Sequence, residues 1–218
     1  MSAISLTVTV LGTGTMGQGI AQVAAQSGHT TRLYDVADGR AAAAVQGIAA
    51  QLEKLVGKGK LTADLRAATL NRLSAATSAK DACAGADVVI EAVPEDMNLK
   101  VAVLEAVLPS AAPSAIVATN TSSLSITELG ARLKVAERTI GLHFFNPPPV
   151  MELVEVVRGL STSEDTIERS LAFVKGLGKT PIVVRDVPGF ATSRLGVILG
   201  AEAMRMLETG VASAQDID

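Results

Sequence analysis

The sequence is poor in aromatic residues and cysteine, and each scarcity narrows the possibilities. It contains no tryptophan, one tyrosine and four phenylalanines among 218 residues, although 48% of its residues are hydrophobic. The core must therefore be built from Ala, Val, Leu and Ile, in one large domain or one domain with part of another. The single cysteine, Cys83, cannot form a disulfide within the chain, and we interpret it as a packed thiol at a helix end.

Strong charge of one sign and long apolar runs are also missing. The formal net charge of −3 leaves no broad basic surface, which argues against nucleic acid as a main partner. No apolar run reaches the length of a membrane span, and the first residues lack the basic start and apolar centre of a signal peptide. These features predict a cytoplasmic protein with no membrane partner. We assign no metal site.

Strand and helix signals alternate along most of the chain. Short apolar segments predict strands at 6–11, 31–34, 87–90, 115–118, 139–145, 151–157 and 181–185. Helical patterns lie at 15–27, 37–57, 62–72, 97–108 and 163–177, and Thr62 is a candidate N-cap. This alternation predicts an α/β protein with a Rossmann-type, doubly wound, mostly parallel sheet that is covered by helices on both faces.

The pattern changes at Val187-Pro188-Gly189, which we interpret as a domain boundary. Residues 190–207 then predict one long helix, whose apolar stripe needs a partner. We therefore divide the chain into a dinucleotide-binding domain at 1–186 and the beginning of an all-helical domain at 187–218.

A glycine-rich turn, Gly12-Thr13-Gly14-Thr15-Met16-Gly17, joins the first strand to the first helix. Its spacing suits a dinucleotide: Gly12 permits a tight turn, Gly14 lets a pyrophosphate approach, and Gly17 lets helix and strand pack closely. The spacing alone is a weak signal. It is strengthened by the strand before it, the helix after it, and Asp35, which ends the next strand 21 residues after Gly14.

Asp35 favours NAD over NADP, because a carboxylate there accepts hydrogen bonds from the ribose hydroxyls and repels a 2′-phosphate. We therefore predict an NAD-binding βαβ unit over residues 4–38. The alternative is that Asp35 is a solvated loop residue and that the glycines are purely structural.

Two later residues suggest acid–base chemistry. His143 lies near the carboxyl end of a predicted strand, where open α/β sheets bind ligands, and histidine can exchange a proton with an alcohol near neutral pH. Glu155 lies in an otherwise apolar strand, where a carboxylate needs a partner, and His143 is the natural one. The alternatives are a core histidine and an exchange of roles between Glu155 and Glu152. His29 is interpreted as a turn residue.

Several segments together resemble the short-chain L-3-hydroxyacyl-CoA dehydrogenase family, especially members that act on 3-hydroxybutyryl-CoA. The segments are residues 12–21, Asn120-Thr121-Ser122-Ser123-Leu124, His143-Phe144-Phe145-Asn146-Pro147, residues 151–156 and Asp186-Val187-Pro188-Gly189-Phe190. The resemblance runs from about residue 4 to the last residue. It implies NAD-dependent, reversible oxidation of a short-chain L-3-hydroxyacyl-CoA to the 3-oxoacyl-CoA, with His143 and Glu155 as the catalytic pair.

The resemblance also implies further roles. Ser122 matches a residue that bonds the 3-oxygen of the substrate or the nicotinamide side, and Asn146 matches one beside the nicotinamide. Glu95 and Lys100 match cofactor contacts, and Lys58 matches a contact to coenzyme A. Structural alternatives are a helix cap for Ser122, a solvated helix charge for Lys100, and for Lys58 a lysine that is favourable at a helix end without any ligand. The neighbouring Lys54 and Lys60 carry no separate assignment.

Two features depart from the family pattern. Ser193 stands where many members have a substrate-site asparagine, in a Gly-Phe-x-x-Asn-Arg segment. Members also continue with a helical domain that completes the substrate pocket and forms much of a dimer interface, so we expect a truncated helical domain here and a homodimer only where that domain is present. Alternative functions are a dehydrogenase of 3-hydroxyadipyl-CoA or of a CoA-free hydroxy acid, and a non-catalytic NAD-binding protein.

Overall fold

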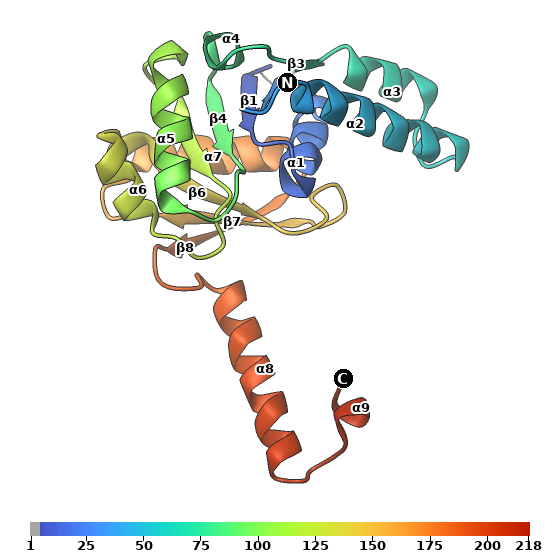
Figure 1. The fold of residues 1–218 in the computed structure, drawn as a ribbon, viewed down its shortest axis with the longest axis vertical. Helices are drawn as coiled ribbons and strands as arrows, with labels where there is room; N and C mark the ends of the chain where they lie inside the picture. The colour runs from blue at the N-terminus through green and yellow to red at the C-terminus, as the bar shows by residue number, and fades with distance from the viewer. Residues whose placement is uncertain (1–4) are drawn as a thin grey trace.

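The computed structural model describes residues 5–218, and eight strands in this range form a single sheet (Figure 1). Ile4, where the predicted βαβ unit begins, lies outside the described residues. The strands are β1 (Thr7–Leu11), β2 (Thr30–Tyr34), β3 (Leu73–Ala75), β4 (Val88–Glu91), β5 (Ile116–Thr119), β6 (Thr139–Phe144), β7 (Leu153–Arg158) and β8 (Thr180–Arg185). Their order is β3-β2-β1-β4-β5-β6-β7-β8, and every neighbouring pair is parallel except β6 and β7. The predicted mostly parallel sheet is confirmed.

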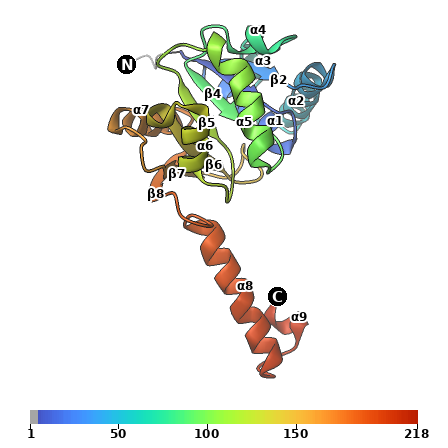
Figure 2. The same cartoon turned by 60° about the vertical axis from the view of Figure 1, so that its left-hand side comes forward.

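Helices cover both faces of this sheet (Figures 1 and 2). One core lies between the sheet and α1 (Thr15–Gln26), α2 (Arg40–Gly57) and α7 (Glu164–Gly176). The other lies under α4 (Ala79–Cys83), α5 (Met97–Val107) and α6 (Ile126–Leu133). Strand residues alternate between the two cores, as the two-residue period of a strand requires. Val88 and Ile90 belong to the first core and Val89 to the second, so the doubly wound architecture is confirmed.

The sequence patterns gave no residue range for three of these elements, although a helix end was expected at Cys83. Strand β3 has three residues and helix α4 has five, which is too short for a periodic signal. Helix α6 does carry such a signal, with buried Ile126, Leu129 and Leu133 at helical spacing. The predicted cap of α3 (Ala63–Leu70) is confirmed, because Thr62 accepts a hydrogen bond from the Leu65 amide.

Two residues interpreted as structural are buried in the fold. Cys83 ends α4, as expected, and burial raises the pKa of its thiol to about 11. His29 follows α1 and precedes β2 but is more than a turn residue. Its Nδ1 accepts a hydrogen bond from the Leu6 amide, and its ring packs against Phe173.

The antiparallel step between β6 and β7 determines where the two candidate catalytic residues lie. The chain leaves β6 after Phe144 and returns beside it as β7, so that His143 is directly opposite Glu155. Side chains of directly opposed residues in an antiparallel pair lie close together on one face of the sheet. The contact predicted between these residues is therefore built into the strand register.

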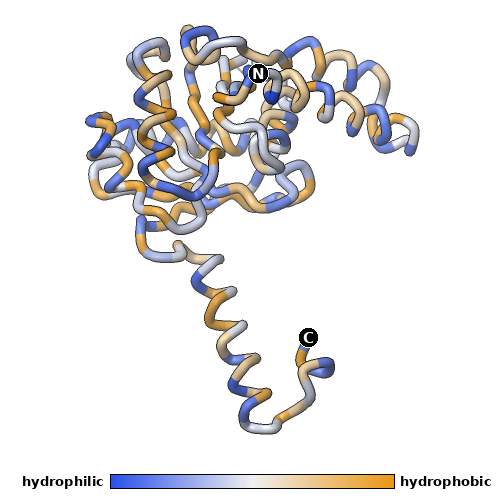
Figure 3. Tube along the Cα trace, viewed as in Figure 1, coloured by the Kyte–Doolittle hydropathy of each residue, from blue (hydrophilic) through white to orange (hydrophobic). Residues whose placement is uncertain are grey.

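Helix α8 (Thr192–Glu208) projects away from the sheet, and the short helix α9 (Ala214–Ile217) follows it (Figures 1 and 2). The predicted long helix is thus present, beginning at Thr192 rather than at Phe190. None of its residues is buried, and Figure 3 shows apolar and polar positions alternating along it. Its exposed large apolar side chains are Leu195, Val197, Ile198, Leu199, Met204 and Leu207. Within residues 5–218, no helix has the combination of length and apolar character needed to cross a membrane.

A glycine substitution tests the packing of the first strand against α1. A Cβ atom on Gly17 would lie 2.0 Å from the carbonyl oxygen of Gly12, whereas one on Gly14 would meet no atom within 4 Å. We expect Gly17→Ala to lower the free energy of unfolding by about 1–3 kcal/mol, because the backbone turn must shift. Gly14→Ala, the matched control, should remain within about 1 kcal/mol of the wild type. Urea denaturation followed by circular dichroism measures both, and equal midpoints for the two variants would contradict the expectation.

Candidate active site

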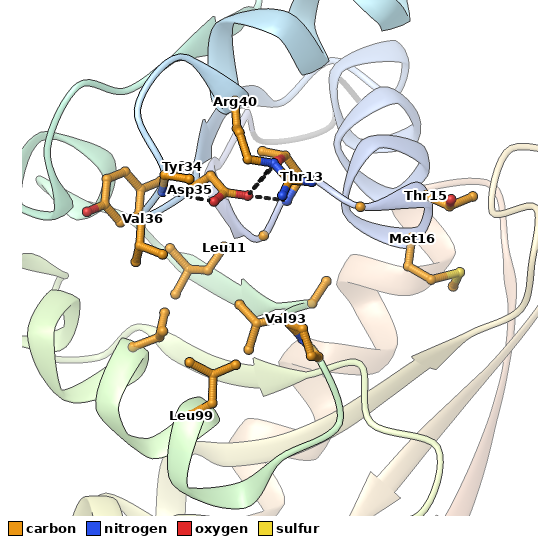
Figure 4. Close-up of a pocket in the computed structure, with 16 residues that line it drawn as sticks. Leu11, Thr13, Thr15, Met16, Tyr34, Asp35, Val36, Arg40, Val93 and Leu99 are labelled. Atoms are coloured by element: carbon orange, nitrogen blue, oxygen red, sulfur yellow. Dashed lines mark hydrogen bonds and ion pairs between the residues drawn. The ribbon is translucent and has the colours of Figure 1, made fainter.

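The predicted dinucleotide residues line one cavity at the carboxyl ends of β1 and β2 (Figure 4). The cavity has a volume of about 500 Å³ and continues over the first turn of α1. Of the residues predicted to contact a cofactor here, five line it: Gly12, Gly14, Thr15, Met16 and Asp35. Gly17 lies behind them, where it provides the close packing expected of the third glycine.

The backbone of the glycine turn suits a bound diphosphate. Gly12 has a φ of +99°, and a Cβ there would lie 2.6 Å from the carbonyl oxygen of Ala92. Gly14 is the N-cap of α1 and gives that helix no side-chain cap. No side chain at Gly14 therefore occupies the first amide groups of α1. Such unoccupied amides at a helix N-terminus attract a phosphate group. The cavity size, the glycines and the helix end all fit NAD.

Asp35 is held at the rim of the same cavity by its neighbours (Figure 4). Its Oδ2 accepts hydrogen bonds from the amide and hydroxyl of Thr13, and its Oδ1 accepts one from the Ala37 amide. Arg40 lies 3.9 Å from the carboxylate. Burial by itself would raise the pKa of Asp35, but these hydrogen bonds and the Arg40 charge hold it below its usual value. Asp35 is therefore an ionised and oriented acceptor at neutral pH.

A second cavity of about 370 Å³ adjoins the first, since Met16, Ala92 and Val93 line both. Its polar lining comes from the carboxyl ends of the parallel strands β4, β5 and β6, from the loops after them, and from the first turn of α5. The lining includes most of the residues predicted to act on the nicotinamide and the substrate: Glu95, Lys100, Ser122, His143 and Asn146. Asn120, which had no predicted role, also lines it and accepts a hydrogen bond from the Phe144 amide.

His143 and Glu155 form a buried pair at the inner side of this cavity. Nδ1 of His143 lies 2.7 Å from Oε2 of Glu155, and the two residues are 7% and 0% exposed. A carboxylate at Nδ1 favours the tautomer with its proton on that nitrogen, which leaves Nε2 as a proton acceptor. Phe145 and Phe190 flank the imidazole ring. Glu152 is exposed, so the partner of His143 is Glu155.

Glu155 has further donors that the sequence did not reveal. Its Oε1 accepts from the amides of Ala191 and Thr192, and its Oε2 also accepts from the Thr192 hydroxyl. Burial by itself would raise the pKa of Glu155. The hydrogen bonds from His143 and Thr192 outweigh that effect and lower the pKa below its usual value. Glu155 is therefore ionised at neutral pH despite being enclosed.

Lys100 is a buried ammonium rather than a solvated helix charge. It is 1% exposed, and its Nζ lies 2.8 Å from Oε1 of Glu91 and 3.2 Å from Oε2 of Glu95. Glu91 also accepts hydrogen bonds from the Thr119 hydroxyl and the Val93 amide. Burial raises the pKa of Glu91, although Lys100 and Thr119 act against that shift. A buried ion pair between Lys100 and Glu91 therefore lies beneath the second cavity. Glu91 is the last residue of β4, just as Asp35 directly follows β2.

Glu95 connects this ion pair to the serine loop. Its Oε1 accepts hydrogen bonds from the Thr121 hydroxyl and from the amide and hydroxyl of Ser122. Burial would raise the pKa of Glu95, but Thr121 and Lys100 together lower it. Ser122 does not cap α6, since that cap is Ser125. Ser122 is thus held on the cavity side of the loop.

Two of the predicted substrate residues lie outside both cavities. Lys58 is exposed at the C-terminal end of α2, close in sequence to the exposed Lys54 and Lys60. Ser193 is in the first turn of α8, next to Thr192. The structure therefore brings the predicted cofactor and catalytic residues together around two adjoining cavities, but Lys58 and Ser193 line neither.

A cavity that suits a dinucleotide and adjoins a second cavity lined by a histidine is the arrangement expected of a nicotinamide-dependent dehydrogenase. Comparison with known families agrees. The family model described as "3-hydroxyacyl-CoA dehydrogenase, NAD binding domain" matches residues 7–187. The chain belongs to this family of NAD-dependent oxidoreductases.

Named relatives cover nearly all of the chain. It is 44% identical to the 3-hydroxyadipyl-CoA dehydrogenase of Escherichia coli over 97% of its length, and 41% identical to the probable 3-hydroxybutyryl-CoA dehydrogenase of Bacillus subtilis over the same share. It spans 44% of the first relative and 73% of the second. The crystal structure of (S)-3-hydroxybutyryl-CoA dehydrogenase from Ralstonia eutropha matches 99% of the chain with a TM-score of 0.93 and 43% identity, over 76% of that protein.

The buried ion pair under the second cavity gives a stability test. Lys100→Met leaves the 0% exposed Glu91 without its counter-ion, and we expect a loss of about 3–5 kcal/mol in the free energy of unfolding. In the double variant Glu91→Gln with Lys100→Met, no unpaired charge is left at this pair, so at least half of that loss should be recovered. Urea denaturation of the wild type, both single variants and the double variant measures this. A double variant no more stable than Lys100→Met would refute the interpretation.

Proposed function

We propose that the protein catalyses the NAD-dependent, reversible oxidation of a short-chain L-3-hydroxyacyl-CoA to the corresponding 3-oxoacyl-CoA. The observation that carries the proposal is the buried His143–Glu155 pair, because His143 lines a cavity that adjoins the dinucleotide cavity. The names of the similar proteins support the choice of substrate class.

His143 is the proposed base. Its Nε2 takes the proton of the substrate hydroxyl during oxidation and returns it during reduction. Glu155 keeps the proton of the imidazole on Nδ1 and stabilises the imidazolium that forms. NAD, when bound, is the acceptor of the hydride that leaves C3 of the substrate.

Other residues in the two cavities bind and orient. Ser122 and Asn146 are proposed to position the substrate oxygen and the nicotinamide, with Glu95 holding the Ser122 loop. The glycine turn would hold the diphosphate of NAD at the N-terminus of α1, and Asp35 would accept hydrogen bonds from the ribose hydroxyls. Lys100 supports this arrangement through its bonds to Glu91 and Glu95.

The proposal also concerns which acyl group the substrate carries. Two of the similar proteins are named for 3-hydroxybutyryl-CoA, and the relative from Escherichia coli is named for 3-hydroxyadipyl-CoA. We propose the former as the substrate and keep the latter as the second candidate. The residues that would contact coenzyme A and the acyl chain include Lys58 and Ser193.

Domain organisation and assembly are part of the proposal. The family match ends at residue 187 and α8 has no buried residue, which supports a boundary at 186/187 and a separate helical segment at 187–218. The exposed apolar side chains of α8 support a homodimer when the helical domain is complete. The single buried cysteine, which forms no disulfide within the chain, is consistent with a cytoplasmic protein.

Replacing the base tests the proposed reaction. We expect His143→Gln to reduce NADH formation from (S)-3-hydroxybutyryl-CoA by about 10²–10⁴-fold, because general-base catalysis is lost. The affinity for NADH should remain, since the dinucleotide cavity is unchanged. Stopped assays measure the rate of NADH formation, and the fluorescence of the nicotinamide measures NADH binding. The chain contains no tryptophan, so tryptophan emission does not interfere with the second measurement. Equal, substantial rates in wild type and variant would rule out the assignment.

Lys58 tests dependence on coenzyme A. If Lys58 contacts a coenzyme A phosphate, Lys58→Ala should raise KM for 3-hydroxybutyryl-CoA by about 5- to 20-fold, with kcat nearly unchanged, because a charge-assisted contact is lost. Activity on free 3-hydroxybutyrate should be far lower and insensitive to the change. Lys134→Ala, a lysine remote from both cavities, is the control. Comparable activity on the free acid would instead favour a CoA-free hydroxy-acid dehydrogenase.

A further inference from the structure

The carboxylate of Glu155 accepts four hydrogen bonds, and three of them come from the beginning of α8. The amides of Ala191 and Thr192 lie 3.1 and 3.0 Å from Oε1. The Thr192 hydroxyl lies 3.0 Å from Oε2, the same oxygen that is 2.7 Å from Nδ1 of His143. Each oxygen therefore has two donors, which determine both the position and the rotation of the carboxylate.

Through these hydrogen bonds Glu155, a residue of strand β7, caps the N-terminus of helix α8. Helix α8 has no side-chain cap at its own N-cap residue, Ala191. Glu155 on β7 supplies the acceptor instead, and its negative charge is also favourable at a helix N-terminus. Glu155 is 0% exposed, so these donors replace the water that the carboxylate lacks. The same side chain thus holds both α8 and the catalytic histidine.

The apolar contacts around this joint are few. Phe190, just before α8, packs in a small cluster with Ile126 and Val157, and its ring flanks His143. No residue of α8 itself is buried. The hydrogen bonds to Glu155 are therefore a major part of what orients the first turn of the helix on the sheet.

We propose that Thr192 is a positioning residue for His143 that acts through Glu155, and that seating of α8 on this carboxylate couples the helical segment to the proton-transfer site. The catalytic consequence rests on the proposed function, whereas the effect on the His143–Glu155 contact does not. When the N-terminus of α8 moves away from Glu155, the carboxylate loses three of its four hydrogen-bond donors. It then no longer has a defined orientation toward Nδ1 of His143.

The hydroxyl of Thr192 is tested with matched variants of the full chain. Thr192→Val removes the hydroxyl and keeps the branched shape, and Thr192→Ser keeps the hydroxyl. Thr209→Val is the control, because its hydroxyl bonds Arg205 at the far end of the same helix. Thr192→Ala compared with Thr192→Ser repeats the test should the valine variant prove unstable. Thermal denaturation establishes that each variant is folded.

The first measurement needs no activity. A buried Nδ1–H donated to a carboxylate should give a low-field proton resonance in the NMR spectrum, assigned by its loss in His143→Gln; the only other histidine is His29. We expect Thr192→Val to shift this resonance upfield or to lose it through exchange with water. Thr192→Ser and Thr209→Val should retain it. An unchanged resonance in Thr192→Val would overturn the proposal.

The second measurement is kinetic. We expect Thr192→Val to lower kcat for 3-hydroxybutyryl-CoA by about 10- to 100-fold, the effect of one hydrogen bond to a charged group, with KM for NAD unchanged. Thr192→Ser should restore kcat. A shifted resonance with an unchanged kcat would refute the positioning role. Inactivity of the wild type on acyl-CoA substrates would count against the proposed function alone, because the resonance still decides whether Thr192 positions the pair.

Discussion

A carboxylate without access to water must be surrounded by donors, and that requirement at Glu155 organises the catalytic side of the molecule. The antiparallel register of β6 and β7 supplies His143 as one donor. The first turn of α8 supplies the others. The orientation of the imidazole and the direction in which α8 leaves the sheet therefore depend on the same two oxygen atoms.

The same principle recurs along the carboxyl edge of the parallel strands. Glu91 ends β4 and is neutralised by Lys100, and Asp35 follows β2 and is held by Thr13. The two acids are held in different ways, Glu91 by a buried lysine and Asp35 by hydrogen bonds and a nearby arginine. Because parallel strands end at one edge, Asp35 and the glycine turn line one cavity, and Lys100, the partner of Glu91, lines the adjoining one.

The NAD-binding unit and the His143–Glu155 pair were predictable from sequence patterns. The glycine spacing, Asp35 and the alternation of apolar segments indicated the NAD-binding unit, because each is a short-range feature with a known geometry. The His143–Glu155 pair followed from the cost of an unpaired carboxylate in an apolar strand. Glu91, at the end of an apolar strand, carries a similar signal. Thr192 carries none, because threonine is common at the start of a helix, where it ordinarily caps that helix itself.

The sequence by itself determined the doubly wound class and the cofactor and indicated a candidate base, His143, since these depend on residue types at fixed spacing. Only the tertiary structure decided which partners Glu91 and Glu95 have and which further donors reach Glu155. Lys100 is buried between Glu91 and Glu95 rather than solvated, and Thr192 contacts a carboxylate 37 residues away. Such pairings bring together residues from separate strands and helices, and the packing of those elements decides which donors reach each acid.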